Sequence, residues 1–116
     1  MPTRKTIKFN NLNLEVEFVI GKNAKENFDI IDDASGHHIW FHVKDSSSSH
    51  VIARLEENLK KKDLRYILKQ GAILCKQYSK MASAKNVEII YSNVCNVTKT
   101  NIIGTVNVSN EKSLMI

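Results

Sequence analysis

Apolar and polar residues alternate between Ile7 and Ile20, and this alternation constrains the fold more than any other feature. The apolar members of the series are Ile7, Phe9, Leu12, Leu14, Val16, Phe18 and Ile20. A repeat of two residues places the apolar side chains on one face of a β-strand. Because asparagine tolerates a positive φ, Asn10-Asn11 predicts a tight turn between two half-buried strands.

A second pair of strands is expected on either side of four consecutive serines. Residues 38–44 and 49–55 are rich in β-branched and aromatic residues. A tight turn centred near Ser46 would pair them in one register. The opposed residues on one face of the sheet are then His42 with His50 and Trp40 with Ile52. The residues on the other face are Phe41, Val43 and Val51.

Two helices are predicted, one short and one long. The short helix covers residues 25–34 and ends at Ser35-Gly36. Asp32-Asp33 lie at its C-terminal end, where the helix dipole disfavours negative charge. The long helix runs from Leu64 to about Ser83, with Asp63 as its N-cap.

The long helix is predicted to carry an apolar stripe and a separate basic ridge. At about 100° per residue, the stripe contains Leu64, Ile67, Leu68, Gly71, Cys75, Tyr78 and Ala82. The ridge contains Arg65, Lys69, Lys76 and Lys80. A glycine in the apolar stripe lowers helix propensity but permits close packing on a sheet.

Strand-like alternation resumes at Val87 and continues to the end of the chain, interrupted by a turn over residues 99–103. A chain of 116 residues with 42% apolar residues fits one domain, residues 1–116. The predicted fold class is α+β, a single compact domain with a mainly antiparallel sheet, one short helix and one long helix. Cys75 in the long helix and Cys95 in a strand have no metal-ligand spacing, and both are predicted to be buried free thiols.

The positive charge is concentrated in the second half of the chain. Residues 1–59 contain seven Lys/Arg against nine Asp/Glu, and residues 60–116 contain ten against three, so the halves carry −2 and +7. A basic half indicates a polyanionic partner, of which nucleic acid is the commonest. An anionic membrane surface and simple solubility are the alternatives. No apolar run approaches the ~20 residues of a membrane span, so we expect a soluble, cytoplasmic protein.

Residues 20–55 hold more reactive and polar groups than a small core requires. Gly21-Lys22-Asn23 before a helix is typical of a phosphate-binding turn, because a lysine and helix N-terminal amides suit an anion. An aromatic ring, imidazoles, hydroxyls and Lys44 on one sheet surface can stack on bases and bond phosphates or 2′-hydroxyls. The alternatives are a core tryptophan, partly buried histidines and a solvated basic helix.

A histidine-based site is a second possibility for this region. His37, His38, His42 and His50 would have to converge on one ion, and zinc commonly takes three or four such ligands. The chain has no H-x-x-x-H helix and no cysteine pair to support this. The four serines lack a Gly-x-Ser-x-Gly elbow, so they are more simply a polar turn than part of a serine hydrolase.

The same residues resemble the signature of the NFACT-R family, the RNA-binding module of NFACT proteins. The matching segments are Gly21-Lys22-Asn23, Glu26-Asn27, Trp40-Phe41-His42-Val43-Lys44-Asp45 and Ser49-His50-Val51. The resemblance extends over nearly the whole chain. Two departures are His38, where the family has an acidic residue, and Ser47-Ser48, where Pro-Gly is common.

The resemblance implies a stand-alone, non-catalytic module without a cofactor or metal that binds structured RNA such as tRNA or rRNA. The implied context is translation or ribosome-associated quality control, with the ribosome or an NFACT-pathway protein as a further partner. DNA could bind through backbone contacts, and no membrane is expected. The predicted RNA-binding residues are Lys22, Asn23, Asn27, Trp40, His42, Lys44, Ser49, His50, Arg65, Lys69, Lys76, Lys80 and Lys99. The alternatives are a small histidine-based metal protein or enzyme, and a ribosome-associated protein-interaction adaptor.

Overall fold

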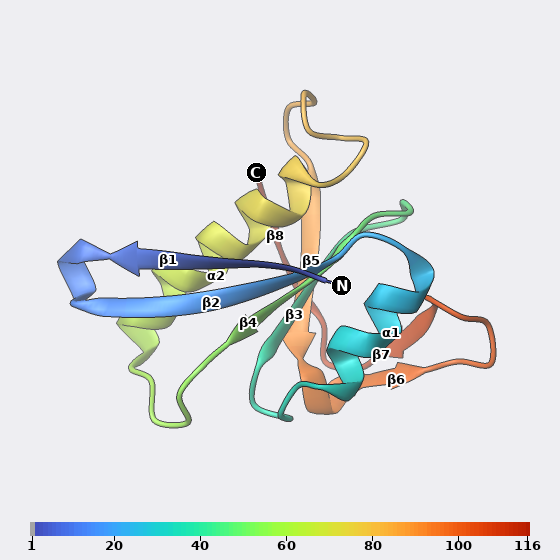
Figure 1. Ribbon diagram of the computed structural model, residues 1–116. Helices are drawn as coiled ribbons and strands as arrows, with labels where there is room; N and C mark the ends of the chain where they lie inside the picture. The colour runs from blue at the N-terminus through green and yellow to red at the C-terminus, as the bar shows by residue number, and fades with distance from the viewer. Residues whose placement is uncertain (1) are drawn as a thin grey trace.

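The computed structural model describes residues 2–116 and has a six-stranded antiparallel sheet at its centre (Figure 1). Its strands are β1 (Thr3–Phe9), β2 (Leu14–Gly21), β3 (Ile39–Val43), β4 (His50–Arg54), β5 (Glu88–Asn93) and β8 (Lys112–Met115). Their spatial order is β1-β2-β4-β3-β5-β8. A separate two-stranded sheet pairs β6 (Val97–Lys99) with β7 (Val106–Val108). The predicted α+β class with a mainly antiparallel sheet is confirmed.

The first hairpin forms as the alternation predicts, but its turn differs from the prediction. Ile7 lies opposite Val16 in the β1–β2 register. A short 3₁₀ helix, η1 (Asn10–Leu12), replaces the expected tight turn, and Asn13 adopts the left-handed conformation at φ 51°. Asparagine is suited to this conformation because its short polar side chain bonds locally. The asparagine with a positive φ is therefore Asn13, and not Asn10 or Asn11.

The second hairpin has the predicted register. Trp40 lies opposite Ile52, and Phe41 lies opposite Val51. One further step along the ladder brings His42 level with His50, and the centroids of the two imidazole rings are 5.0 Å apart. Side chains alternate between the two faces of a sheet along each strand, so His42 and His50 lie on the same face as Trp40.

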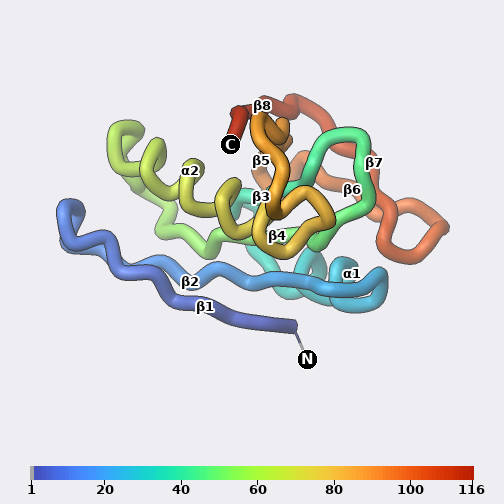
Figure 2. The backbone as a smooth tube through the Cα atoms, turned by 90° about the horizontal axis from the view of Figure 1, so that it is seen from above, coloured from blue at the N-terminus to red at the C-terminus, as the bar shows by residue number. Residues whose placement is uncertain are grey.

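Two helices cover opposite faces of the sheet, as Figures 1 and 2 show. Helix α2 (Lys61–Gln77) packs on the face of Phe18 and Phe41, and helix α1 (Ala24–Asp32) packs on the face of Val19 and Trp40. Each face has its own buried apolar cluster. The strands between the helices are therefore buried on both sides, which agrees with their nearly continuous apolar sequences.

Helix α2 begins and ends earlier than its sequence predicts. Lys60 is the N-cap, and Asp63 lies in the first turn, where its negative charge interacts favourably with the positive end of the helix dipole. The helix ends at Gln77 because Ser79 competes for its backbone groups: the Ser79 hydroxyl donates to the Lys76 carbonyl at 2.7 Å. Ser79 also forms an isolated bridge with Ser48. The predicted extension to Ser83 was wrong.

Gly71 gives the closest approach between α2 and the sheet. A Cβ atom at this position would lie 2.3 Å from Phe41 Cζ. The predicted close packing at this glycine is therefore confirmed. Because the Phe41 ring is fully buried, it has little room to move away.

We expect Gly71→Ala to lower the free energy of unfolding by about 1–3 kcal/mol through overpacking, although alanine raises helix propensity by ~1 kcal/mol. Chemical denaturation of both proteins measures the change. Gln77→Ala, an exposed substitution on the same helix, is the control. A Gly71→Ala variant as stable as the natural chain would contradict the close packing.

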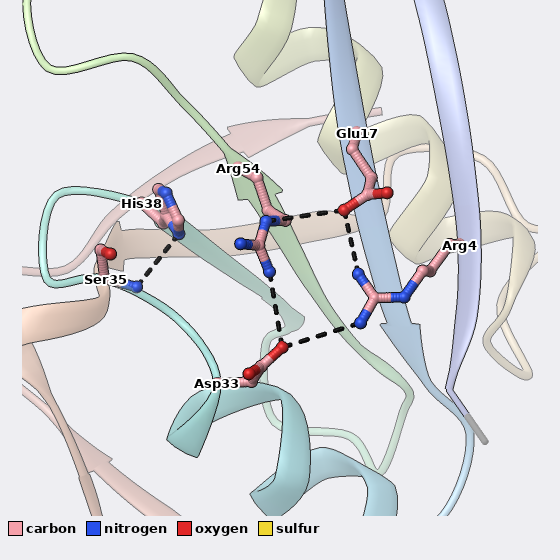
Figure 3. Close-up of polar contacts among 6 residues, drawn as sticks. All are labelled: Arg4, Glu17, Asp33, Ser35, His38 and Arg54. Carbon is pink, nitrogen blue, oxygen red and sulfur yellow. Dashed lines mark hydrogen bonds and ion pairs between the residues drawn. The ribbon is translucent and has the colours of Figure 1, made fainter.

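The acidic end of α1 is stabilised by arginines from neighbouring strands (Figure 3). Asp33 Oδ2 lies 3.5 Å from Arg54 Nη1 and 3.7 Å from Arg4 Nη2. Glu17 completes the group, with its Oε1 2.9 Å from Arg4 Nη1. Asp32 pairs with Lys99. These ion pairs are partly exposed and individually weak, but they offset the unfavourable position of two carboxylates at a helix C-terminus.

The two cysteines have different environments, so the prediction that both are buried was wrong for Cys95. Cys75 is fully buried, its Sγ lies 3.6 Å from the Ser49 carbonyl oxygen, and burial raises the pKa of its thiol to about 12. Cys95 is exposed in the 3₁₀ helix η2 (Val94–Asn96). Strand β5 stops at Asn93, and the 3₁₀ turn directs Val94 inward and Cys95 outward. No helix among residues 2–116 is long and apolar enough to cross a membrane.

Candidate nucleic-acid interface

A cavity of about 880 Å³ lies where β2 leads into α1, beside the β3–β4 turn and the end of α2. Its walls come from segments that are far apart in the sequence. Eight of the thirteen predicted RNA-binding residues line it: Lys22, Asn23, Asn27, Trp40, His42, Ser49, His50 and Lys80. The volume is typical of sites that bind small organic groups.

Three aromatic rings lie together in the lining of the cavity. Trp40 and His42 are stacked, with centroids 5.6 Å apart and planes inclined by 6°. His50 stands perpendicular to both rings. The indole N–H of Trp40 donates to Nδ1 of His50 at 3.1 Å, so the proton of the neutral His50 ring is on Nε2.

Both cavity histidines are electrically neutral near pH 7. Burial lowers the pKa of His50 to about 3, with a smaller contribution from nearby His42. Burial also lowers the pKa of His42, against a hydrogen bond with the backbone of Val43 that raises it. These imidazoles therefore offer hydrogen bonds and ring faces to a ligand, without a positive charge.

Trp40 is 1% exposed, which makes it a core residue that supports the cavity. One indole face is covered by His42. The predicted role of Trp40 as a base-stacking surface requires a ring face that this burial does not leave open. Trp40 contacts both cavity histidines, through its stack with His42 and its hydrogen bond to His50.

Asn27 fixes the junction between α1 and the strands. It is 7% exposed, and its Oδ1 accepts the backbone N–H of His50 at 3.1 Å. Gly21 makes this approach possible, because a Cβ there would lie 2.5 Å from the same Oδ1 atom. A larger residue at position 21 would therefore displace Asn27.

Two backbone N–H groups at the N-terminus of α1, where a phosphate-binding turn was predicted, are bonded by side chains of the same segment. Asn23 Oδ1 accepts the N–H of Glu26 at 2.9 Å, and Glu26 Oε1 accepts the N–H of Lys22 at 3.0 Å. Asn23 is thus a bonded N-cap, and Glu26 bonds the residue before the cap in a variant of the capping box. The Glu26 carboxylate thus lies at the N-terminus of α1, where its negative charge disfavours a second anion, while the Lys22 side chain is exposed.

Tyr78 and Lys5 complete a basic and aromatic surface that the sequence pattern did not single out. Tyr78 lines the cavity, and its ring lies 5.4 Å from both Lys5 Nζ and Lys22 Nζ. Such distances allow cation–π attraction. Tyr78 had been assigned to the apolar stripe of α2, and nothing in its local sequence distinguishes it from a core residue.

Another wall of the cavity, made by β7 and the loop before it, contains none of the predicted RNA-binding residues. Its lining residues are Ile103, Gly104, Thr105, Val106, Asn107 and Val108. Gly104 has a φ of 85°, and a Cβ there would lie 2.7 Å from the Ala24 side chain. The glycine thus lets this loop touch the start of α1. In the sequence, Gly104 between Thr100 and Thr105 indicates a turn but does not indicate a contact with α1.

The other five predicted residues lie outside the cavity lining. Lys44 Nζ is 3.7 Å from Glu88, and Lys99 pairs with Asp32. Lys76 donates to the Ile116 carbonyl at 3.3 Å. The remaining two, Arg65 and Lys69, are exposed on α2. Because Lys80 lies beyond the end of the helix, the predicted four-residue ridge is not one helical surface.

A family model described as the NFACT protein RNA binding domain matches residues 6–110. The chain belongs to this family. Coiled-coil domain-containing protein 25 from Mus musculus and from Bos taurus are each 36% identical over 83 residues, which cover 70% of this chain and 40% of each relative. The chain thus spans less than half the length of these curated relatives.

The fold of this NFACT RNA-binding domain also occurs in a solved structure, the C-terminal part of the fibronectin/fibrinogen-binding protein from Streptococcus suis. The TM-score is 0.82 at 21% identity, and the match covers 99% of this chain and 44% of that chain. At this identity the likeness demonstrates the fold alone. The family, and not this structure, supports an RNA-binding module, and it is consistent with a protein that is not an enzyme.

The two departures from the NFACT-R signature differ in place: His38 lies outside the cavity lining, whereas Ser47 and Ser48 are part of it. His38 is 5% exposed, and its Nδ1 accepts the N–H of Ser35 at 3.2 Å (Figure 3), away from the cavity lining. The Ser48 hydroxyl accepts the N–H of Val43 at 3.2 Å and so supports the β3–β4 turn. Among residues 2–116, no three His, Cys, Asp or Glu side chains are placed to hold a metal ion together, so the four histidines do not converge.

Proposed function

We propose that this NFACT RNA-binding domain binds structured RNA, such as tRNA or rRNA, without catalysing a reaction, and that the cavity is its main contact. The observation that supports this is the gathering of eight of the predicted RNA-binding residues, from Lys22 to Lys80, around one cavity. We further propose a cytoplasmic, ribosome-associated context, with the ribosome or an NFACT-pathway protein as a second partner.

The charges around the cavity support contact with a phosphate backbone at the mouth. Lys22 and Lys80 are exposed and line the cavity, and Lys5 lies beside them over Tyr78. Asp45 and Glu111 also line it, so the lining itself is not strongly basic. Phosphates would meet the lysines at the mouth, while neutral groups of the RNA would meet the neutral wall.

The salt dependence of binding tests this arrangement. Each phosphate that a lysine neutralises contributes about −0.7 to −0.9 to the slope of log K against log salt concentration. We expect the double variant Lys22→Ala, Lys80→Ala to reduce the steepness of that slope by about 1.5 for a tRNA-sized RNA. Fluorescence anisotropy across a salt series measures it.

The matched control removes two positive charges elsewhere. Arg65→Ala, Lys69→Ala changes the net charge equally but lies outside the cavity lining. We expect this variant to retain most of the slope. A larger effect from the control pair would move the RNA site to α2, and a flat slope in the natural chain would refute an electrostatic contribution altogether.

A further inference from the structure

Two hydrogen-bond donors open on the cavity in fixed orientations. Asn27 Oδ1 is held by the His50 backbone N–H, which leaves its Nδ2 group pointing away from that bond. His50 Nδ1 is held by the Trp40 indole, which leaves Nε2–H as the free donor. Among the described residues, no group bonds Asn27 Nδ2 or His50 Nε2. Every side-chain nitrogen or oxygen of these residues that is shielded from solvent does have a hydrogen-bond partner, so these two unbonded atoms are not shielded. Both atoms therefore reach the cavity space.

The residues that carry these donors are more than nine-tenths buried. Asn27 is 7% exposed and His50 is 2% exposed. Their donors are therefore recessed within the cavity and do not lie on the protein surface. A ligand reaches them only by inserting a group that carries hydrogen-bond acceptors.

His42 provides a ring surface beside these donors. It is partly exposed and lines the cavity. The indole of Trp40 lies parallel to one face of its ring, and His50 stands at right angles to it. The stacked pair thus leaves the opposite imidazole face without a parallel aromatic neighbour among the described residues.

We propose that the cavity receives one unpaired nucleotide of the bound RNA, whose base stacks on His42 and accepts hydrogen bonds from Asn27 and His50. This inference rests on the proposed RNA-binding function. The acceptors are the carbonyl oxygens or ring nitrogens of the base, and the adjoining phosphates lie near Lys22 and Lys80. Bases within a duplex are stacked and paired, so only an extruded or single-stranded nucleotide can enter.

Three kinds of RNA hairpin with the same stem sequence test the proposal. One is fully paired, one carries a single bulged nucleotide, and one carries an abasic site at the bulge; the bulged RNA is prepared with each of the four bases. We expect at least one bulged RNA to bind about fivefold or more tightly than the paired stem, because stacking of one base contributes on this scale. The abasic bulge should bind like the paired stem, because it keeps the backbone kink without a base.

Asn27→Asp tests the donor directly. The substitution keeps an oxygen that accepts the His50 N–H and replaces the Nδ2 donor with a second oxygen. We expect the ratio of bulged to paired affinity to fall to about one. Asn58→Asp, at an exposed position outside the cavity lining, adds the same charge and should preserve the ratio. Thermal unfolding verifies that Asn27→Asp remains folded, and the abasic comparison uses the natural chain and does not depend on any variant.

The outcomes separate the two proposals. Equal binding of paired, bulged and abasic hairpins would overturn the nucleotide site and leave RNA binding intact. An unchanged ratio in folded Asn27→Asp would likewise overturn it. Failure of every RNA, including the paired stem and a tRNA-sized RNA, to bind would refute the proposed function as well.

Discussion

Trp40→Ala is expected to lower the free energy of unfolding by about 3–5 kcal/mol, which is the usual cost of removing a fully buried tryptophan. The indole is 1% exposed and belongs to the apolar cluster that includes Ile30 and Ile52. Its loss would leave a void between α1 and the sheet and would remove the hydrogen bond to His50. Urea denaturation at pH 8 measures the change.

Trp40→Phe separates the packing contribution from the hydrogen bond. Phenylalanine keeps an aromatic ring but cannot donate to His50 Nδ1. We expect a loss of about 1–3 kcal/mol from the unsatisfied acceptor and the smaller ring. If Trp40→Ala proved nearly as stable as the natural chain but lost RNA affinity, the indole would contact RNA directly, as the sequence pattern had indicated.

Acidification is expected to destabilise the fold below pH 6.5, largely through His50. Its pKa is about 3 in the folded chain, against an ordinary value of 6.5. Between these values the unfolded chain binds a proton that the folded chain does not, so stability falls as the pH falls. One such group contributes a slope of ~1.4 kcal/mol per pH unit. Burial also lowers the pKa of His42 and His38, and their contributions have the same sign.

Urea denaturation at pH 8 and at pH 5 measures this dependence in the natural chain and in His50→Gln. Glutamine can accept the Trp40 N–H but does not titrate in this range. We expect the variant to be less stable than the natural chain at pH 8 and to lose less stability between pH 8 and pH 5. Parallel pH dependence in the two proteins would mean that His50 is readily protonated in the folded state.

The β-structure and the family could be predicted from the sequence because both depend on local patterns. The alternation of apolar residues determines which side chains of a strand share a face, and a turn centred at Ser46 determines the pairing of Trp40 with Ile52. The short signature segments around Gly21, Trp40 and His50 were sufficient to indicate the family, which the match over residues 6–110 confirms. Gly71 was recognised for the same reason, since its place in the apolar stripe is a property of helical spacing.

Contacts between distant segments determine which of these residues are buried and which line the cavity. Trp40 and His50 are buried because α1 covers their face of the sheet, and Tyr78 and the loop over residues 103–108 join the cavity through packing between segments far apart in the chain. Helix α2 stops at Gln77 because Ser79 bonds the backbone and pairs with the β3–β4 turn. The sequence thus determined the strands, their register and the family, whereas burial, helix ends and the cavity depend on long-range packing that no local pattern encodes.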